Sequence, residues 1–175
     1  MNTLEEEKAL AGNSRINLLE NRIVLAVPEG NPSGIESFDQ LSELLKQGQV
    51  LLSIGNSDVP VGQYTQKIFA YYGLDEEALQ KAGSLTYGSN VKEVTTHVKE
   101  EAANCGIIYA TDAFSAGLEA VDGATEEMCG KVIYPAAVLK NSAHEKEARE
   151  LLQYLTEEEA KKIFESVGFT AVSDH

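Results

Sequence analysis

The stretch Val50–Tyr72 has the composition of a strand, a turn and a helix, and the start of such a helix could bind an anion. An apolar run gives way to a short polar turn, and a helical pattern begins after Pro60. Proline has no N–H and suits the first position of a helix, and the N–H groups of Val61, Gly62 and Gln63 are expected to find no carbonyl four residues earlier. Such donors and the positive end of the helix dipole attract an anion. Taken alone, the stretch favours an ordinary strand–helix connection whose donors bind water, because most such turns bind nothing.

A second strand–helix connection of similar construction spans Tyr87–Val94. Asn90 is a suitable N-cap, and Glu93, three residues later, has the spacing of a capping box. The helix would then begin at Val91, whose N–H is a second candidate donor. Two helix starts of the same kind strengthen the prediction of an anion site.

Tyr109 is a candidate side-chain donor from a third segment. The apolar run Cys105–Ala113 is typical of a buried strand that runs into a polar turn, and it places Tyr109 at the carboxyl end of that strand. Ligands collect at this edge of open α/β sheets. We therefore expect Val61, Val91 and Tyr109 to lie on one concave surface. The alternative for the tyrosine is a half-buried aromatic ring whose hydroxyl donates to a neighbouring carbonyl.

The sequence lacks the motifs of metal binding and of common catalytic sites. Cys105 and Cys129 are too far apart for a CxxC motif, and the histidines do not cluster with them at metal-ligand spacing. Cys105 is interpreted as a small apolar residue, with a bridge to Cys129 as the alternative. The GxxxxGK and GxSxG patterns are missing, and no set of nucleophile, base and orienting residue can be assembled. We therefore expect a binding protein that has no catalytic residues, no cofactor and no bare metal ion.

Charge and length limit the class of protein further. The 175 residues include 28 Asp and Glu against 14 Lys and Arg, a formal net charge of −14, so the surface repels nucleic acid and anionic membranes. An anion would need a closed site of neutral dipoles that act at short range. The acidic N-terminus is unlike an export signal, and no apolar run has the length of a membrane span.

Apolar runs alternate with helical patterns along the chain, which predicts an α/β fold. The last strand-like run, Lys131–Leu139, contains Pro135, so we interpret it as two strand halves joined at a crossing point. The segment Phe114–Gly130 is weakly patterned and is expected to be surface structure. The other predicted strands are Arg22–Val27, Val50–Ile54, Leu85–Tyr87 and Cys105–Ala113, and helical spacing is found in Phe38–Leu45, Tyr64–Tyr71, Asp75–Lys81, Val94–Ala102, Ala148–Leu155 and Ala160–Val167.

Five motifs in order resemble the extracytoplasmic molybdate-binding protein of ABC importers. They are NRIVLAVP at Asn21–Pro28, VPVGQY at Val59–Tyr64, SNV at Ser89–Val91, GIIYATDA at Gly106–Ala113 and YPAAV at Tyr134–Val138. The resemblance implies a type II periplasmic binding protein, in which two α/β lobes are joined by crossing strands and hold an oxyanion between them. Arg22–Val27 and Val132–Leu139 correspond to the crossing strands.

The resemblance also implies roles for the site residues. Val61 and Val91 would contribute backbone N–H groups and Tyr109 its hydroxyl, all from one lobe. The family's serine-bearing loops near its N-terminus have no counterpart in this sequence. We therefore expect one near-complete lobe at 28–135, the remnant of a second lobe at 1–27 and 136–175, and a chain that is a truncated form of the family without its signal peptide.

The implied function is the capture of molybdate or tungstate by neutral hydrogen-bond donors, with sulfate not distinguished, and delivery to an ABC permease outside the cytoplasm. Two alternatives remain open. A ligand-sensing domain of a transcription regulator would need an attached DNA-binding helix-turn-helix, of which this N-terminus has no sign. A degenerate fragment would only self-associate. Apolar faces in the incomplete lobe favour a homodimer through that lobe.

Overall fold

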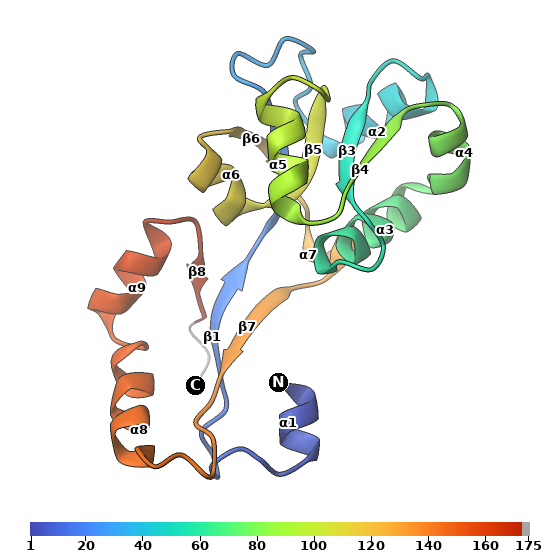
Figure 1. Cartoon of the computed structure of the whole chain (residues 1–175). Helices are drawn as coiled ribbons and strands as arrows, with labels where there is room; N and C mark the ends of the chain where they lie inside the picture. The colour runs from blue at the N-terminus through green and yellow to red at the C-terminus, as the bar shows by residue number, and fades with distance from the viewer. Residues whose placement is uncertain (173–175) are drawn as a thin grey trace. The chain divides into compact units, whose positions relative to one another are not determined.

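The computed structural model describes residues 1–172, in which strands and helices alternate (Figure 1). The strands are β1 (Ile16–Asn21), β2 (Ile23–Val27), β3 (Leu52–Gly55), β4 (Leu85–Gly88), β5 (Cys105–Tyr109), β6 (Glu119–Gly123), β7 (Val132–Ala136) and β8 (Thr170–Ala171). The helices are α1 (Asn2–Glu6), α2 (Phe38–Lys46), α3 (Pro60–Tyr72), α4 (Glu76–Lys81), α5 (Val91–Lys99), α6 (Ala110–Ala116), α7 (Glu126–Cys129), α8 (Glu145–Tyr154) and α9 (Glu158–Glu165).

The chain forms two compact units. Unit 1 consists of Met1–Asn21 and the chain from Val132 onward, and unit 2 is Arg22–Lys131. The predicted lobe 28–135 corresponds to unit 2 except at its ends. There, β2 lies inside the sheet of unit 2 because it is hydrogen-bonded to β5 on one side and to β6 on the other.

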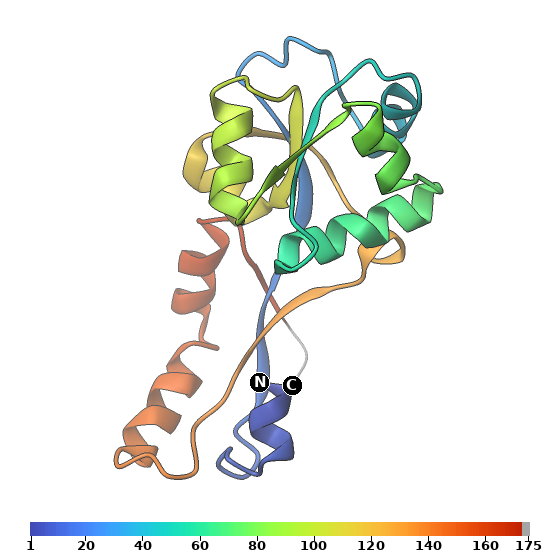
Figure 2. The ribbon, with the colours of Figure 1, turned by 45° about the vertical axis from the view of Figure 1, so that its right-hand side comes forward.

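Unit 2 contains a sheet with the strand order β4-β3-β5-β2-β6 (Figure 2). Strands β4, β3 and β5 are parallel, and β2 is antiparallel to both of its neighbours. Every residue of β2 and β3 is buried, as expected for continuous apolar runs at the centre of an α/β sheet. Helix α5 covers one face, where the Ser53 hydroxyl lies 2.9 Å from His97 Nδ1.

The helix starts in unit 2 follow their local capping signals. The side chains of Ser37 and Asp75 accept hydrogen bonds from the third helical residue of α2 and α4. Asn90 caps α5 as predicted, since its Oδ1 accepts from the N–H of Glu93. The return bond differs from a capping box. The Glu93 carboxylate accepts from the N–H and the hydroxyl of Ser89, at 2.7 and 2.8 Å, and not from the N–H of Asn90.

Two segments that follow Tyr109 differ from the sequence prediction. The strand ends at Tyr109 and α6 begins at Ala110, so the predicted strand Cys105–Ala113 is too long. The N–H of Ala110 donates to the carbonyl of Arg22, a partner far away in sequence that local patterns cannot reveal. The segment Phe114–Gly130 lies largely at the surface, as predicted, but it also contains two elements that were not predicted, the edge strand β6 and the helix α7.

Unit 1 contains an antiparallel sheet with the order β7-β1-β8. The prediction that Pro135 divides its strand was wrong, because Pro135 lies within β7. The ladder tolerates the proline because β7 is an edge strand and the register shifts between Asn17 and Leu19 of β1, beside the residue that pairs with Pro135. Strand β1 was not predicted.

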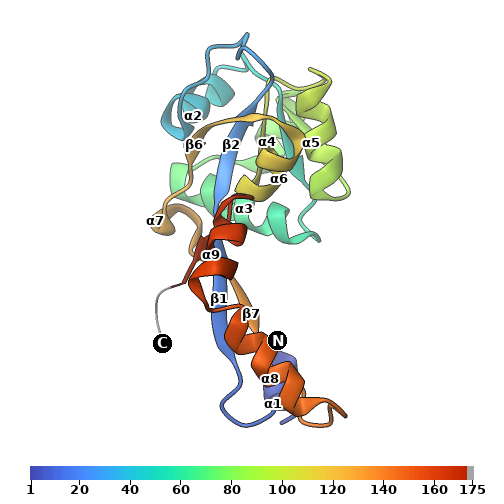
Figure 3. The same cartoon turned by 90° about the vertical axis from the view of Figure 1, so that its left-hand side faces the viewer.

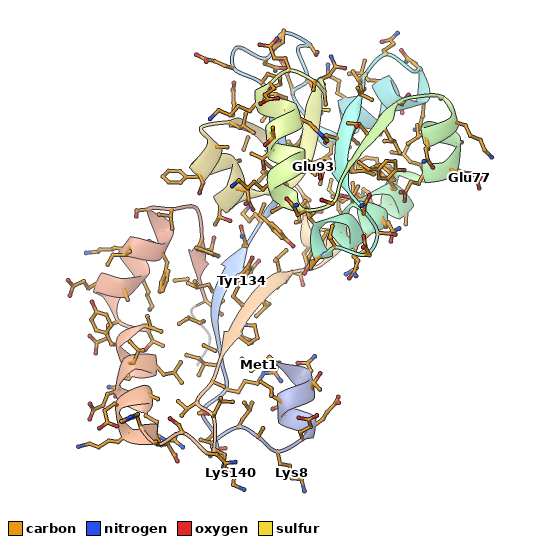
Figure 4. The ribbon with its side chains drawn as sticks, viewed as in Figure 1. Met1, Lys8, Glu77, Glu93, Tyr134 and Lys140 are labelled. Atoms are coloured by element: carbon orange, nitrogen blue, oxygen red, sulfur yellow. The ribbon has the colours of Figure 1, made fainter. Side chains whose placement is uncertain are left out.

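Helices α8 and α9 follow one another along unit 1 (Figure 3), and several of their apolar side chains are exposed. Helix α8 has no buried residue, although its apolar side chains have helical spacing. Leu151 and Ile163 are each 58% exposed, and Tyr134 of β7, labelled in Figure 4, is 40% exposed. Unit 1 therefore buries little of its apolar surface within residues 1–172.

Candidate functional site

Three strand–helix connections of unit 2 meet at one edge of its sheet. Because β3, β4 and β5 are parallel, their carboxyl ends lie together, at the lower end of the unit in Figure 1. Gly55 at the end of β3 pairs with Gly88 at the end of β4, and the N–H of Asn56 donates to the carbonyl of Gly88 at 2.9 Å. Helices α3, α5 and α6 begin just beyond these ends. The topology thus places Val61, Val91 and Tyr109 at the same edge.

Small residues bring the start of α3 close to the end of β3. A Cβ at Gly62 would clash with the carbonyl oxygens of Gly55 and Asn56, so the helix backbone lies against the turn at this position. A Cβ at Gly55 would lie 2.5 Å from Val61 Cγ1. Val61 as a whole residue is 2% exposed, so its side chain is buried and only its backbone N–H is a candidate donor.

The donors at the start of α3 are fewer than predicted. The N–H groups of Gly62 and Gln63 both donate to the carbonyl of Val59, at 3.0 and 3.2 Å. The prediction was wrong for these two, because Val59 is the N-cap and its carbonyl accepts the first helical bonds. Within residues 1–172, the N–H of Val61 has no intramolecular acceptor. One N–H at this helix start therefore has no partner within the described chain.

The start of α5 has the same pattern. The Asn90 side chain accepts from the N–H of Glu93, and the Asn90 carbonyl accepts from the N–H of Val94. The N–H of Val91, at the first helical position, has no acceptor within the described part of the chain. The Val91 side chain packs on the buried cluster beneath α5 and α6, which fixes the helix start over the strand end.

Tyr109 lies at the N-cap position of α6 and is partly buried. Its ring makes an edge contact with the ring of Tyr64, with centroids 6.4 Å apart and planes at 78°. The ammonium group of Lys67, one turn further along α3, lies 5.1 Å from the Tyr64 ring centroid. Sequence reasoning missed Tyr64 and Lys67 as neighbours of the site. Their spacing along α3 shows that they share a helix face, but nothing local shows that this face meets Tyr109.

Two carboxyl groups near this edge have shifted pKa values. The bonds from Ser89 hold the pKa of the Glu93 carboxyl below its ordinary value, and burial raises the pKa of Asp112 in α6. Within residues 1–172, no three His, Cys, Asp or Glu side chains gather as metal ligands. Cys105 and Cys129 are free thiols, so the alternative of a bridge is wrong, and burial raises the pKa of Cys105 to about 12.

Comparison with known proteins identifies the family. Residues 1–170 match the family described as bacterial extracellular solute-binding protein. The chain belongs to this family. It is 32% identical over 170 residues to YvgL of Bacillus subtilis, which is described as an ABC transporter substrate-binding lipoprotein, and 29% identical over 173 residues to the molybdate-binding protein ModA of Haemophilus influenzae. These alignments cover 96% and 95% of the chain but 62% of each relative, so the chain spans about three fifths of the length of the curated relatives it matches.

Solved structures of solute-binding proteins share the fold. A substrate-binding domain attributed to a molybdenum ABC transporter of Clostridium difficile superposes with a TM-score of 0.83 at 26% identity, over 99% of this chain and 73% of that one. The periplasmic molybdate-binding protein of Azotobacter vinelandii gives a TM-score of 0.76 at 15% identity. The chain therefore has the mixed α/β fold of periplasmic binding proteins over part of their length.

Two further findings concern catalysis and membranes. A relative from a Pseudomonas species, 28% identical over 166 residues, is named aconitate isomerase, whereas the other relatives described above are solute-binding proteins. No helix within residues 1–172 is both long enough and apolar enough to cross a membrane.

Proposed function

We propose that this chain is the solute-binding component of an ABC importer and that its ligand is molybdate or tungstate. The main supporting observation is the pair of N–H groups at Val61 and Val91 that have no acceptor within residues 1–172, at the edge where Tyr109 also lies. Similarity to YvgL, to ModA and to the Clostridium difficile domain supports the transport role and the class of ligand.

The proposed donors are all uncharged. Backbone N–H groups at helix starts and a tyrosine hydroxyl donate to oxygen atoms without a buried cation, so they favour a fully deprotonated tetrahedral oxyanion over a protonated one. Discrimination between molybdate or tungstate and the smaller sulfate would then depend on the spacing of the donors. Lys67 adds a positive charge beside Tyr64, and this charge favours the approach of an anion to an acidic protein.

As a component of such an importer, the protein would work together with a membrane permease. The ligand would be captured outside the cytoplasm and passed to an ABC permease, without a catalysed reaction and without nucleic acid as a partner. The exposed apolar faces of α8 and α9 support association of unit 1 with a second copy.

Calorimetric titration with sodium molybdate, sodium tungstate and sodium sulfate tests the proposal. Tyr109→Phe removes one donor to a charged ligand and is expected to weaken molybdate binding by about 1–3 kcal/mol. Tyr71→Phe is the matched control, because it removes the same hydroxyl group from a tyrosine that is 51% exposed on α3. If the chain does not bind molybdate or tungstate, or if Tyr109→Phe binds both as tightly as the control, the proposed site is wrong.

A further inference from the structure

A groove of about 340 Å³ runs between α5 and α6 in unit 2. The two helices pack against each other through the cluster that includes Val94 and Ala113. On the α5 side, the groove is lined by Lys92, Thr95, Thr96 and Lys99. The spacing of these four residues places them on one helix face, with the lysines at its two ends. A rise of 1.5 Å per residue puts the two lysine backbones about 10 Å apart along the groove.

The two lysines of the groove differ from three other lysines of this acidic unit. Lys46, Lys81 and Lys131 each form an ion pair with a nearby glutamate. Within residues 1–172, neither Lys92 nor Lys99 has a carboxylate within ion-pair distance. Lys99 donates to the carbonyl of Ala116 at the end of α6, at 3.1 Å. The groove therefore has at each end a lysine that forms no ion pair within the described chain.

The opposite wall of the groove contains a hydrogen-bond acceptor. Asp112 of α6 is partly buried and has no hydrogen bond or ion pair within the described residues. Ser115 lies one turn along on the same wall, where its hydroxyl can donate or accept. The hydroxyls of Thr95 and Thr96 donate to carbonyls of their own helix. Asp112 is thus the group of this wall best placed to accept N–H donors from an occupant.

We propose that the α5–α6 groove is a docking site for a short acidic peptide segment of a partner protein. Carboxylates of the peptide pair with Lys92 and Lys99, and a peptide N–H donates to Asp112. Charge complementarity selects an anionic occupant, and the separation of the lysines selects an elongated one over a small oxyanion. Asp112 disfavours an inorganic polyanion, which has no donors to offer. The concave shape disfavours a flat anionic membrane surface.

Fluorescence anisotropy with defined peptides tests this docking site. The probe is a fluorescein-labelled hexapeptide with glutamate at alternate positions, and its control carries glutamine at the same positions. The groove variant is Lys92→Gln/Lys99→Gln. The matched control is Lys46→Gln/Lys81→Gln, which makes the same change in net charge at ion-paired lysines of α2 and α4. Each variant is titrated at low and high salt, because screening weakens exposed ion pairs.

We expect the acidic peptide to bind the wild type in preference to the glutamine peptide. The groove variant should lose about tenfold in affinity, as two partly exposed ion pairs imply, while the control variant changes less than twofold. Asp112→Ala should weaken the same complex. Molybdate titration of the groove variant should match the wild type, so failure of this site and failure of the proposed oxyanion site are distinguishable.

Three results would overturn the docking site. The first is an equal loss of peptide affinity in the groove and control variants. The second is no preference of the wild type for the acidic peptide over the glutamine peptide. The third is that the peptide does not bind, whereas vesicles rich in anionic lipid bind in a way that depends on Lys92 and Lys99.

Discussion

Replacing Gly62 with alanine tests the packing that positions the start of α3. The new Cβ would clash with the carbonyl oxygens of Gly55 and Asn56. Both obstacles are backbone atoms, so neither can move aside as a flexible side chain would. Relief requires α3 to shift away from β3, and the N–H of Val61 would shift with it.

The size of the effect follows from two opposing contributions. Overpacking of a tight site costs about 1–3 kcal/mol and occasionally more, whereas alanine stabilises a helix by about 1 kcal/mol relative to glycine. Two backbone clashes at one Cβ place the cost at the upper end of its range. We therefore expect Gly62→Ala to lower the free energy of unfolding by about 1–2 kcal/mol.

Urea unfolding followed by circular dichroism measures this change, and a loss of that size lowers the midpoint by about 0.5–1 M at a typical slope. Gly12→Ala is the control for the substitution itself, because a Cβ at Gly12 meets no atom within 4 Å. Molybdate titration of the same protein reports whether the Val61 donor has moved. If Gly62→Ala is as stable as the wild type and binds molybdate equally well, the close approach of helix and turn is wrong.

Three other predictions concern titration, thiol reactivity and association. The hydrogen bonds from Ser89 lower the pKa of Glu93 in the folded protein. Ionised Glu93 should therefore stabilise the folded state above the ordinary pKa of a glutamate, and this contribution should be lost as the pH falls through the lowered pKa. An NMR titration midpoint for Glu93 at or above the ordinary pKa would contradict this prediction. Cys105, fully buried with a pKa of about 12, should resist alkylation at pH 8 until the protein unfolds, and rapid labelling of the native protein would refute its burial. Light scattering should show a dimer that Leu151→Glu/Ile163→Glu dissociates, and a wild-type monomer at high concentration would exclude association through unit 1.

The features that sequence reasoning predicted correctly are fixed by neighbours in the chain. Asn90 caps α5 because its side chain reaches the N–H three residues later. The buried strands β2 and β5 have apolar residues on both faces, which is the signature of the centre of a sheet. Val61 and Val91 could be identified as candidate donors for the same reason, since a helix start leaves its first N–H groups without local acceptors, but their contact with a ligand stays a prediction.

The features that were missed depend on residues distant in sequence. The first N–H of helix α6, that of Ala110, is satisfied by the carbonyl of Arg22. Strand β7 continues through Pro135 because it is an edge strand beside an irregular register. The ring contact between Tyr64 and Tyr109 joins segments that only the sheet brings together. Local composition carries no information about these pairings, so they could not be predicted from a single sequence.

The burial of the Val61 side chain against Gly55 affects how this edge can be studied by mutation. If the chain's contribution here is a main-chain amide, alanine scanning will leave the donor in place and report little change. Many side chains could occupy the position without altering the chemistry offered to a ligand. Chemical synthesis that replaces the amide between Pro60 and Val61 with an ester would delete the donor, although it also weakens the Pro60 carbonyl as an acceptor, and conventional mutagenesis cannot make this change.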